Sequence, residues 1–396
     1  MQVIIAGGGP AGAIAAGKLS ANGIRTILFE RKLDNDKTCA GGIPSALVKE
    51  FDIPDEIIHQ KCRNIRFYAP SGFMVELEFP DSGFLATVRR NEFDRYLREW
   101  AISRGAIIEE KEVSGYEMSD DGIKVNYKDS GGVHYWAKAD YLIGADGAVS
   151  RIAKILKKDR LEYVASIQEF IKPNRDGMAH WDGVSELFYS SEISPNYYGW
   201  IFPHRDYVAL GVGARYEHAK KIEKYLENLK NLNSRWLNGG EVIKRATALI
   251  PATQYSEPAS DRVFLIGDAA GFVLPGSGEG IYYAMKSGQF AAEAIVGKHL
   301  EHHTNPELTY NSKCDREFRQ NFNYFRRIEK ITFKNDYTRE IFVRFCREPG
   351  AAVNALSVFS IKKPLRHSNV ISKIKRLVTL NKIRIEIKKE GLNLSR

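Results

Sequence analysis

The N-terminal residues combine glycine spacing with an acid in a pattern typical of dinucleotide-binding sites. A short apolar run ends at Ala6, and Gly7, Gly9 and Gly12 follow it in the spacing G-x-G-x-x-G. In such a loop the first glycine permits a tight turn, the second lets the backbone approach a pyrophosphate, and the third lets helix and strand pack closely. A second apolar run ends in Glu30, where an acid would accept hydrogen bonds from the adenosine ribose. We therefore predict that amides at the N-terminus of the intervening helix bind the phosphates of a dinucleotide.

A second glycine-rich stretch, GDAAGFVLPGSGEGIYYAMKSG, lies far from the first, at residues 267–288. It follows the apolar run VFLIG, and another such run leads into Asp146. Strands that end in an acid this late in the chain resemble the FAD-dependent oxidoreductases of the glutathione-reductase and hydroxybenzoate-hydroxylase type, whereas an NAD domain would usually form one contiguous block. The resemblance implies that Asp268 binds the ribityl chain of FAD; the alternative is an acid that caps a helix. It also implies that the amides of Gly280 and Ile281 face the flavin pyrimidine, where negative charge gathers on reduction.

Other polar residues have less specific patterns. Ser277 and Glu279 fit an ordering role in the glycine-rich loop as well as they fit a contact with a ligand. The nine histidines show no metal-ligand spacing, so no metal site is expected. The four cysteines are too scattered to form a disulfide framework.

These motifs predict an α/β fold: a Rossmann-like FAD-binding domain of the glutathione-reductase and hydroxybenzoate-hydroxylase type, an antiparallel-sheet substrate domain and a helical C-terminal region. Residues 1–65, 90–155 and 260–300 would build the FAD-binding domain. Residues 66–89 and 156–259 would supply the substrate-binding sheet, with strands in FYAPSGFMVELEF and YVALGVGARY. Residues 301–396 would form the helical, basic C-terminal region.

The charge of the chain is concentrated at its C-terminal end. The formal net charge is +9, and residues 361–396 contain 11 Lys or Arg and two Glu, which accounts for all of it. In VISKIKRLVTL, apolar residues recur at helical spacing between basic ones, at Ile371, Ile374, Leu377 and Val378. That pattern suits the surface of an anionic membrane, and a solvated terminal helix is the alternative. The IRIEI run that follows alternates instead, which argues against a single long helix. No recognition motif accompanies the charge, so no nucleic-acid partner is expected.

The length and the hydropathy pattern set the broad class. A chain of 396 residues predicts two or three domains. No apolar run approaches the roughly 20 residues of a membrane span, and no signal-like segment precedes MQVIIAGGG. We therefore expect a cytoplasmic protein that is peripheral on the membrane if its basic tail binds lipid.

Several longer stretches resemble one family. They are ERKLDNDKTCAGGIPSALVKEFDIP at residues 30–54, VRRNEFDRYLREWA at 88–101, PNYYGWIFP at 195–203 and FKNDYTREIFVRFC at 333–346. Together with the glycine-rich stretch at residues 267–288, which we call the flavin loop, they are similar to the chlorophyll-type geranylgeranyl reductases. The broader family includes archaeal lipid and menaquinone side-chain reductases. The chain departs from the family where CGG becomes Cys39-Ala40-Gly41-Gly42 and in the loop LPGSGEG, which leaves the exact substrate open.

The resemblance implies a reaction and an electron donor. Reduced FAD would saturate C=C bonds of a prenyl chain by hydride transfer, with NADPH or reduced ferredoxin as the source of electrons. Cys39 would lie near the flavin and donate a proton or shape the pocket; the alternative is a small apolar filler. Arg90 resembles the FAD-contacting arginine of the family, and its neighbour Arg89 is the alternative.

The prenyl chain needs an apolar pocket with aromatic walls. Tyr198, Trp200 and Phe202 alternate, so in a strand they share one face. The resemblance favours a pocket wall for them, whereas the pattern alone favours a core. His204 and Asp206 follow this motif without a predicted role.

The predicted cofactor-binding set is Gly7, Gly9, Ala11, Gly12, Glu30, Arg31, Cys39, Ala40, Gly42, Arg90, Asp146, Asp268, Gly280 and Ile281. Three other functions stay open on this scaffold. One is the reduction of archaeal lipid or menaquinone chains, and another is aromatic monooxygenation or halogenation. A halogenase would show WxWxIP with a catalytic lysine, where this chain has YGWIFP. The third is a flavoprotein without enzymatic activity.

Overall fold

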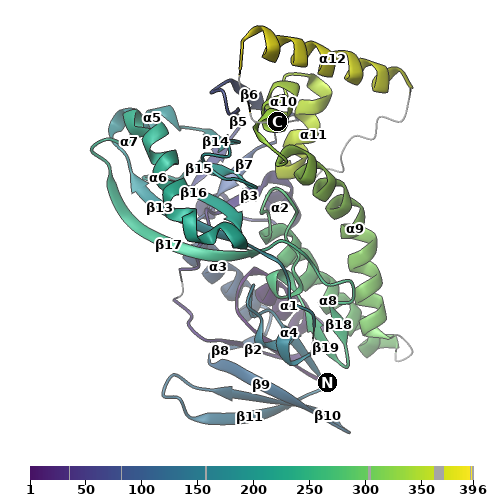
Figure 1. The fold of residues 1–396 in the computed structure, drawn as a ribbon. Coiled ribbons are helices and arrows are strands. Elements are labelled where there is room, and N and C mark those ends of the chain that lie inside the picture. Colours follow the sequence, from purple (N-terminus) through teal and green to yellow (C-terminus); the bar gives the residue numbers. More distant parts are fainter. Residues whose placement is uncertain are drawn as a thin grey trace. The chain divides into compact units, whose positions relative to one another are not determined.

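The computed structural model describes residues 1–34, 36–81, 83–156, 158–301, 305–360, 370–392 and 394 (Figure 1). Contacts divide the chain into two compact units that alternate along the sequence. The first unit comprises Met1–Lys37, Arg90–Tyr163 and Leu249–Asn323, and the second comprises Thr38–Arg89, Val164–Ala248 and Tyr324–Arg396. Residues 38–65, which the sequence analysis groups with the FAD-binding domain, belong to the second unit. None of the helices within the described ranges is long and apolar enough to cross a membrane.

The first unit is built on a six-stranded sheet with the order β18-β19-β12-β1-β2-β8. Its strands are β1 (Gln2–Ala6), β2 (Arg25–Glu30), β8 (Ile107–Glu110), β12 (Tyr141–Gly144), β18 (Ala259–Ser260) and β19 (Val263–Leu265). All neighbours are parallel except β18 and β19. The central strands read as unbroken buried runs, as expected for a parallel sheet covered on both faces. This architecture confirms the predicted α/β fold class.

Helices of the first unit pack through small residues. They are α1 (Pro10–Ala21), α3 (Arg90–Ile102), α4 (Arg151–Ile155), the short η3 (Gly267–Ala270), α8 (Ile281–Glu301) and the first part of α9 (Pro306–Thr332). A Cβ on Gly288 of α8 would lie 2.3 Å from the carbonyl oxygen of Ala11 on α1, and a Cβ on Gly17 would lie 2.1 Å from the Trp100 ring on α3. Helix α1 therefore needs small residues on two sides, where it packs against α8 and against α3. A separate three-stranded sheet contains β9 (Glu112–Ser119), β10 (Gly122–Lys128) and β11 (His134–Ala139).

The second unit contains a seven-stranded, mostly antiparallel sheet with the order β17-β13-β16-β15-β14-β5-β6. Its strands are β5 (Asn64–Tyr68), β6 (Met74–Glu78), β13 (Tyr163–Lys172), β14 (Val184–Phe188), β15 (Gly199–Pro203), β16 (Val208–Arg215) and β17 (Glu241–Pro251). The strands predicted in FYAPSGFMVELEF and YVALGVGARY are confirmed as β5, β6 and β16. A small sheet of β3 (Gly42–Pro44), β7 (Leu85–Thr87) and β4 (Gln60–Cys62) completes the unit's strands in the described segments.

Helices account for much of the rest of the second unit. They are α2 (Ser45–Glu50), η1 (Asp55–Ile57), α5 (Arg175–His180), η2 (Tyr216–Lys221), α6 (Ile222–Leu232), α7 (Ser234–Leu237), α10 (Asp336–Phe345), α11 (Pro349–Ser360) and α12 (Val370–Lys389).

The last helix corrects one expectation. The predicted break before IRIEI is wrong, because α12 continues through it (Figure 1). Ile383 and Ile387, one turn apart, are both buried, and Glu390 accepts a hydrogen bond from Arg344 of α10 at 2.8 Å. Packing against α10 therefore overrides the alternating pattern. The side chains of Ile371, Ile374 and Leu377 lie outside the described residues.

Candidate functional site

The glycine loop after β1 has one open position and two crowded ones. Gly7 adopts a φ of 111°, and a Cβ there would lie 2.3 Å from the carbonyl oxygen of Ala145. A Cβ on Gly12 would lie 2.0 Å from the carbonyl oxygen of Gly7, whereas a Cβ on Gly9 would meet nothing within 4 Å. Gly7 and Gly12 are thus required by backbone packing. The space above Gly9 lets a ligand approach the backbone at the N-terminus of α1.

Glu30 is held against this loop. One of its carboxylate oxygens accepts a hydrogen bond from the Gly8 amide at 2.6 Å, and the other accepts from the Lys32 amide at 3.2 Å. Arg98 of α3 fixes the other side of the loop, because its guanidinium donates to the carbonyl oxygens of Gly8 at 3.2 Å and Leu33 at 2.7 Å. Arg98 is not among the residues predicted from the sequence. The i, i+4 spacing of Arg90, Asp94 and Arg98 would have placed it on the same face of the predicted helix.

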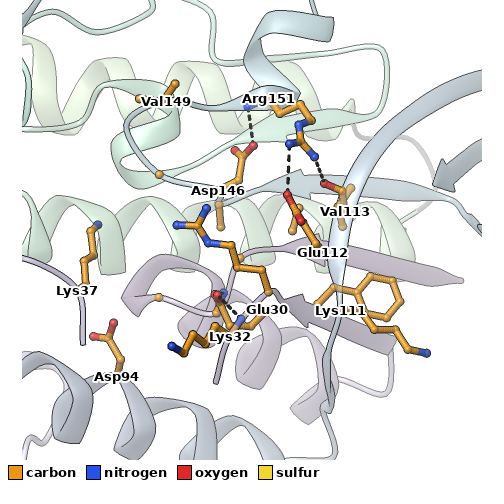
Figure 2. A pocket seen from close by; sticks show the side chains of 18 of the residues that line it. Glu30, Lys32, Lys37, Asp94, Lys111, Glu112, Val113, Asp146, Val149 and Arg151 are labelled. Atoms are coloured by element: carbon orange, nitrogen blue, oxygen red, sulfur yellow. Dashed lines mark hydrogen bonds and ion pairs between the residues drawn. The ribbon is translucent and has the colours of Figure 1, made fainter. Parts of the chain in front are cut away.

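A cavity of about 380 Å³ opens over these residues, and Figure 2 shows its walls. Six cationic side chains line it: Arg31, Lys32, Lys37, Arg98, Lys111 and Arg151. Four acids also line it: Glu30, Asp94, Glu112 and Asp146. The lining therefore has two more cationic than acidic side chains, which suits the negative charge of a pyrophosphate.

Asp146 is committed to the start of α4. It accepts hydrogen bonds from the Ser150 hydroxyl at 2.6 Å and from the Ile152 amide at 3.1 Å. It also accepts from the Arg151 amide at 2.7 Å (Figure 2). Burial raises the pKa of its carboxyl, and these hydrogen bonds oppose the shift. Asp146 thus forms part of the cavity wall as a helix-capping residue, and its predicted contact with a cofactor stays a prediction.

Arg90 is nearly completely buried and makes a bidentate pair with Asp94, with both N–O distances at 2.9 Å. Asp94 and Arg98 line the cavity directly. Arg90 therefore acts on this wall through Asp94. Its alternative, Arg89, belongs to the second unit, where its guanidinium lies 5.3 Å from the Tyr207 ring centroid.

The late glycine-rich stretch places Asp268 beside the N-terminus of α8. Asp268 lies in η3, and a Cβ on Gly280 would lie 3.4 Å from its carboxylate. Lys37 donates to the same carboxylate at 3.0 Å, an ion pair that the sequence analysis did not foresee. Gly280 directly precedes Ile281, the first residue of α8. The structure thus brings Asp268, Gly280 and Ile281 together, and their predicted contacts with FAD stay predictions.

Ser277 and Glu279 both order this loop. The Ser277 hydroxyl accepts from the Glu279 amide at 3.1 Å, and one oxygen of the Glu279 carboxyl accepts from the Tyr282 amide at 2.8 Å. Glu279 is 8% exposed, and its second carboxyl oxygen is buried without a hydrogen-bond partner. Burial raises the pKa of this carboxyl to about 8.

In the second unit, the segment Cys39–Gly42 is shaped by its glycines. The half-buried Cys39 accepts a hydrogen bond on its sulfur from the Gly41 amide at 3.3 Å. A Cβ on Gly41 would lie 2.0 Å from the Val88 carbonyl oxygen, and one on Gly42 would lie 2.9 Å from the Phe202 ring. Both glycines are therefore needed where they stand, and Ala40 occupies the position that tolerates a side chain.

A buried histidine pair supports this segment. His204 Nε2 lies 3.1 Å from the Ala40 carbonyl oxygen, which can only accept, so Nε2 carries the proton. His204 Nδ1 then accepts from His59 Nδ1 at 3.4 Å. Burial lowers the pKa of His204 to about 3, which keeps the ring neutral. His204 had no predicted role, and only its position after PNYYGWIFP could have signalled one.

Of the three predicted aromatic residues, Trp200 and Phe202 lie on β15 and Tyr198 directly precedes it. All three are less than 9% exposed, and the ring centroids of Tyr198 and Trp200 are 6.0 Å apart. Trp200 lies opposite Gly211 and Phe202 opposite Ala209 on β16, so small residues provide the space for the rings. Burial is common to a core and to a pocket wall, and the role of these rings as a pocket wall stays a prediction.

Comparisons with known proteins agree with this geometry. The model of the FAD-binding domain family matches residues 1–321. The chain is 35% identical to a geranylgeranyl diphosphate reductase of Synechocystis over 88% of this chain and 89% of that protein. It is 33% identical to the chloroplastic geranylgeranyl diphosphate reductase of Arabidopsis thaliana over 98% and 88%. FAD, the predicted cofactor, is thereby confirmed.

Solved structures show the same fold at low identity. A geranylgeranyl bacteriochlorophyll reductase-like protein from Thermoplasma acidophilum superposes with a TM-score of 0.80 at 19% identity, covering 98% of both chains. The flavin-dependent brominase Bmp2 superposes with a TM-score of 0.75 at 15% identity, covering 99% of both. By its matched domain and its curated relatives, the chain belongs to the FAD-dependent geranylgeranyl reductase family.

Proposed function

We propose that this protein is an FAD-dependent oxidoreductase that saturates C=C bonds of a geranylgeranyl chain, carried as the diphosphate or attached to a chlorophyll-type pigment. The observation that carries the proposal is the 33–35% identity to proteins named geranylgeranyl diphosphate reductase over most of both chains. The cationic cavity beside the glycine loop supports it, since it supplies a place for the cofactor pyrophosphate.

Reduced FAD supplies the hydride when it is bound, and the chain supplies binding, orientation and a dry site. The α1 N-terminus and the cavity cations would hold the pyrophosphate, and Glu30 would accept from the ribose. Asp268 would hold the ribityl chain, with Gly280 and Ile281 facing the pyrimidine. An isolated alkene accepts hydride poorly unless a proton is added to its other carbon first or at the same time. Positive charge then develops on the carbon that takes the hydride, and water must be excluded. We assign the apolar wall to Tyr198, Trp200 and Phe202.

The other carbon of the double bond must receive a proton. We propose Cys39 as the candidate donor, because it is partly accessible and its backbone segment is fixed from two sides, by Val88 and by His204. Electrons would reach the flavin from NADPH or reduced ferredoxin. We further propose a cytoplasmic protein that binds the membrane surface through α12, because its lipophilic substrate partitions there and basic residues of α12 face outward.

A second candidate is the reduction of archaeal lipid chains. The chain is also 27% identical to a digeranylgeranylglycerophospholipid reductase of Methanospirillum hungatei over 99% of its length. Both candidates share the reaction and differ in what the prenyl chain is attached to.

One assay tests the reaction and separates the substrates. The FAD-loaded protein is reduced with dithionite under anaerobic conditions and mixed with geranylgeranyl diphosphate, a geranylgeranylated pigment or an unsaturated archaeal-type ether lipid. We expect product heavier by one or more pairs of hydrogen atoms by mass spectrometry with one of the first two. Mass gain with the ether lipid alone would favour the second candidate, and no gain with any of them would contradict the reductase function.

A further inference from the structure

Helix α10 buries charge where a helix usually buries apolar side chains. It lies in the segment 333–346, which resembles the geranylgeranyl reductases and has no part in the function proposed above. Its buried residues are Arg339, Glu340, Val343 and Arg344, of which only one is apolar. Burying a charge costs free energy even when it is paired, and a well-packed apolar side chain is often at least as stable. The stability of the helix alone therefore does not account for this face.

Arg339 joins α10 to the connection between β14 and β15. Its side chain is 1% exposed, and its guanidinium pairs with Asp336 at 3.1 Å. The same guanidinium donates to the carbonyl oxygens of Ser194, at 3.4 Å, and of Pro195. Asp336 in turn accepts from the Ser191 amide at 2.8 Å and from the Ser191 hydroxyl. One arginine and its partner acid thus hold this connection at three places along its backbone.

The same connection leads into the aromatic residues of β15. The rings of Tyr197 and Tyr198 stack with centroids 4.5 Å apart, and the Tyr198 ring meets the Trp200 ring edge-on at 6.0 Å. The Tyr197 amide donates to the Ser194 hydroxyl at 2.9 Å, and that hydroxyl donates to a backbone carbonyl of β16 at 2.6 Å. Ser194, and with it the two tyrosines, is therefore held by Arg339 on one side and by β16 on the other.

We propose that Arg339 is a positioning residue for the prenyl site, which acts through the backbone of Ser194 and Pro195 on the Tyr198 and Trp200 rings. The inference rests on the proposed function, which assigns these rings to the wall of that site. A prenyl chain offers no polar atoms along its length, so the position of its double bond depends on the shape of the wall. A guanidinium suits this task, because its planar fork donates to several oxygens at once in a fixed geometry and a lysine ammonium does not.

Arg344 provides a matched control on the same helix. It is 2% exposed and donates to Glu340 at 2.7 Å and to Glu390 at 2.8 Å. Glu340 accepts from the amide of Ser71 at 3.1 Å and from its hydroxyl at 2.8 Å. The two arginines thus share burial and ion pairing, but Arg344 stabilises the turn between β5 and β6 rather than the connection before β15.

The test compares Arg339→Lys with Arg344→Lys in the full, FAD-loaded chain. By hydrogen exchange and mass spectrometry, Arg339→Lys should speed amide exchange in residues 189–198, and Arg344→Lys should speed it in residues 69–73. Arg339→Lys should also raise the Michaelis constant for the prenyl substrate that the wild type reduces, by about tenfold, and Arg344→Lys should leave it within about twofold. Both variants should keep the wild-type Kd for FAD. Equal Michaelis constants in the two variants, or unchanged exchange at residues 189–198 in Arg339→Lys, would overturn the proposal.

A milder pair of substitutions keeps the test decisive if the lysine variants do not fold. Ser191→Ala removes the hydroxyl bond to Asp336, and Ser71→Ala removes the corresponding bond to Glu340. Only Ser191→Ala should speed exchange in residues 189–198 and raise the Michaelis constant, by about threefold. Equal effects of the two would overturn the proposal.

Failure of the proposed function is visible separately, in the wild type. A wild type that reduces none of the offered substrates would contradict the reductase function. The exchange measurement contains no prenyl substrate, so it shows on its own whether Arg339 holds the connection before β15.

Discussion

Lys37 and Asp268, 231 residues apart in the sequence, are joined by a hydrogen-bonded ion pair of 3.0 Å at the start of the flavin loop. The pair places a cation from the segment after β2 on the acid that the motif predicts for the ribityl chain. Lys37 also lines the cavity proposed for the pyrophosphate, but its side chain is 42% exposed, so the pair should contribute little to the stability of the FAD-free protein.

Replacing Asp268 tests its predicted role. Asp268→Ala should weaken FAD binding by about 10- to 100-fold, since a hydrogen bond to a charged group is lost. Lys37→Met should change the free energy of unfolding of the FAD-free protein by no more than about 1 kcal/mol, because partly exposed ion pairs contribute little. Fluorescence titration measures the FAD affinity of Asp268→Ala, and thermal unfolding measures the stability of Lys37→Met. Wild-type FAD affinity in Asp268→Ala would assign the acid to helix capping alone.

The glycine loop provides a matched pair of substitutions. Gly12→Ala should destabilise the fold by at least about 3 kcal/mol, because its Cβ would collide with the Gly7 carbonyl oxygen. Gly9 has open space around its Cα and a φ of −74°. The free energy of unfolding of Gly9→Ala should therefore lie within about 1 kcal/mol of the wild-type value. Its methyl group should nevertheless lower FAD affinity about tenfold or more by blocking the pyrophosphate. Equal effects of the two substitutions on stability would contradict this division.

His204 should make the protein sensitive to acid. Its pKa is about 3 in the folded state and about 6.5 when unfolded, so the unfolded state binds an extra proton between these values. Stability should therefore fall as pH drops below 6.5, by about 2 kcal/mol at pH 5 from this residue alone. His204→Gln should flatten that part of the profile measured by urea unfolding at several pH values. Parallel profiles for the two proteins would exclude His204 as the source.

Gly211 should determine the position of Trp200. A Cβ on Gly211 would lie 2.4 Å from the indole ring, so Gly211→Ala should displace the ring and cost about 1–3 kcal/mol of stability. Gly297→Ala is the control, because its Cβ would meet nothing within 4 Å and alanine favours the helix. Near-UV circular dichroism and the Michaelis constant for the prenyl substrate should change in the first variant only. An unchanged Michaelis constant with a displaced ring would assign Trp200 to the core.

The outward face of α12 should attract anionic lipid. Lys382, Lys388 and Lys389 are exposed, whereas Ile383 and Ile387 face the protein. Replacing the three lysines by glutamine should weaken binding to vesicles containing phosphatidylserine by about 1 kcal/mol per lysine. Co-sedimentation measures the binding to vesicles, and neutral vesicles provide the comparison. Equal binding by the wild type and the triple variant would show that α12 is a solvated helix.

Local sequence patterns were sufficient to predict the elements whose structure a short motif determines. The G-x-G-x-x-G spacing, the unbroken apolar strands and the acid at the end of β2 predicted the parallel sheet and the glycine loop. The structure adds long-range pairs that no local pattern contains, such as Lys37 with Asp268 and His204 with Ala40. The alternation in IRIEI failed for a related reason, because α10 packs against α12 and its Arg344 pairs with Glu390 just after the end of that helix.

The two units alternate along the chain, and this has a consequence for synthesis on the ribosome. In the six-stranded sheet, β12 pairs with β19 at residues 263–265. The ribosome therefore makes the apolar strands β1, β2 and β12 long before it makes β19. Until then β12 presents an uncovered edge, which is prone to aggregation. We expect nascent chains shorter than about 265 residues to depend on chaperones, and neither unit to be obtainable by simply cutting the gene in two.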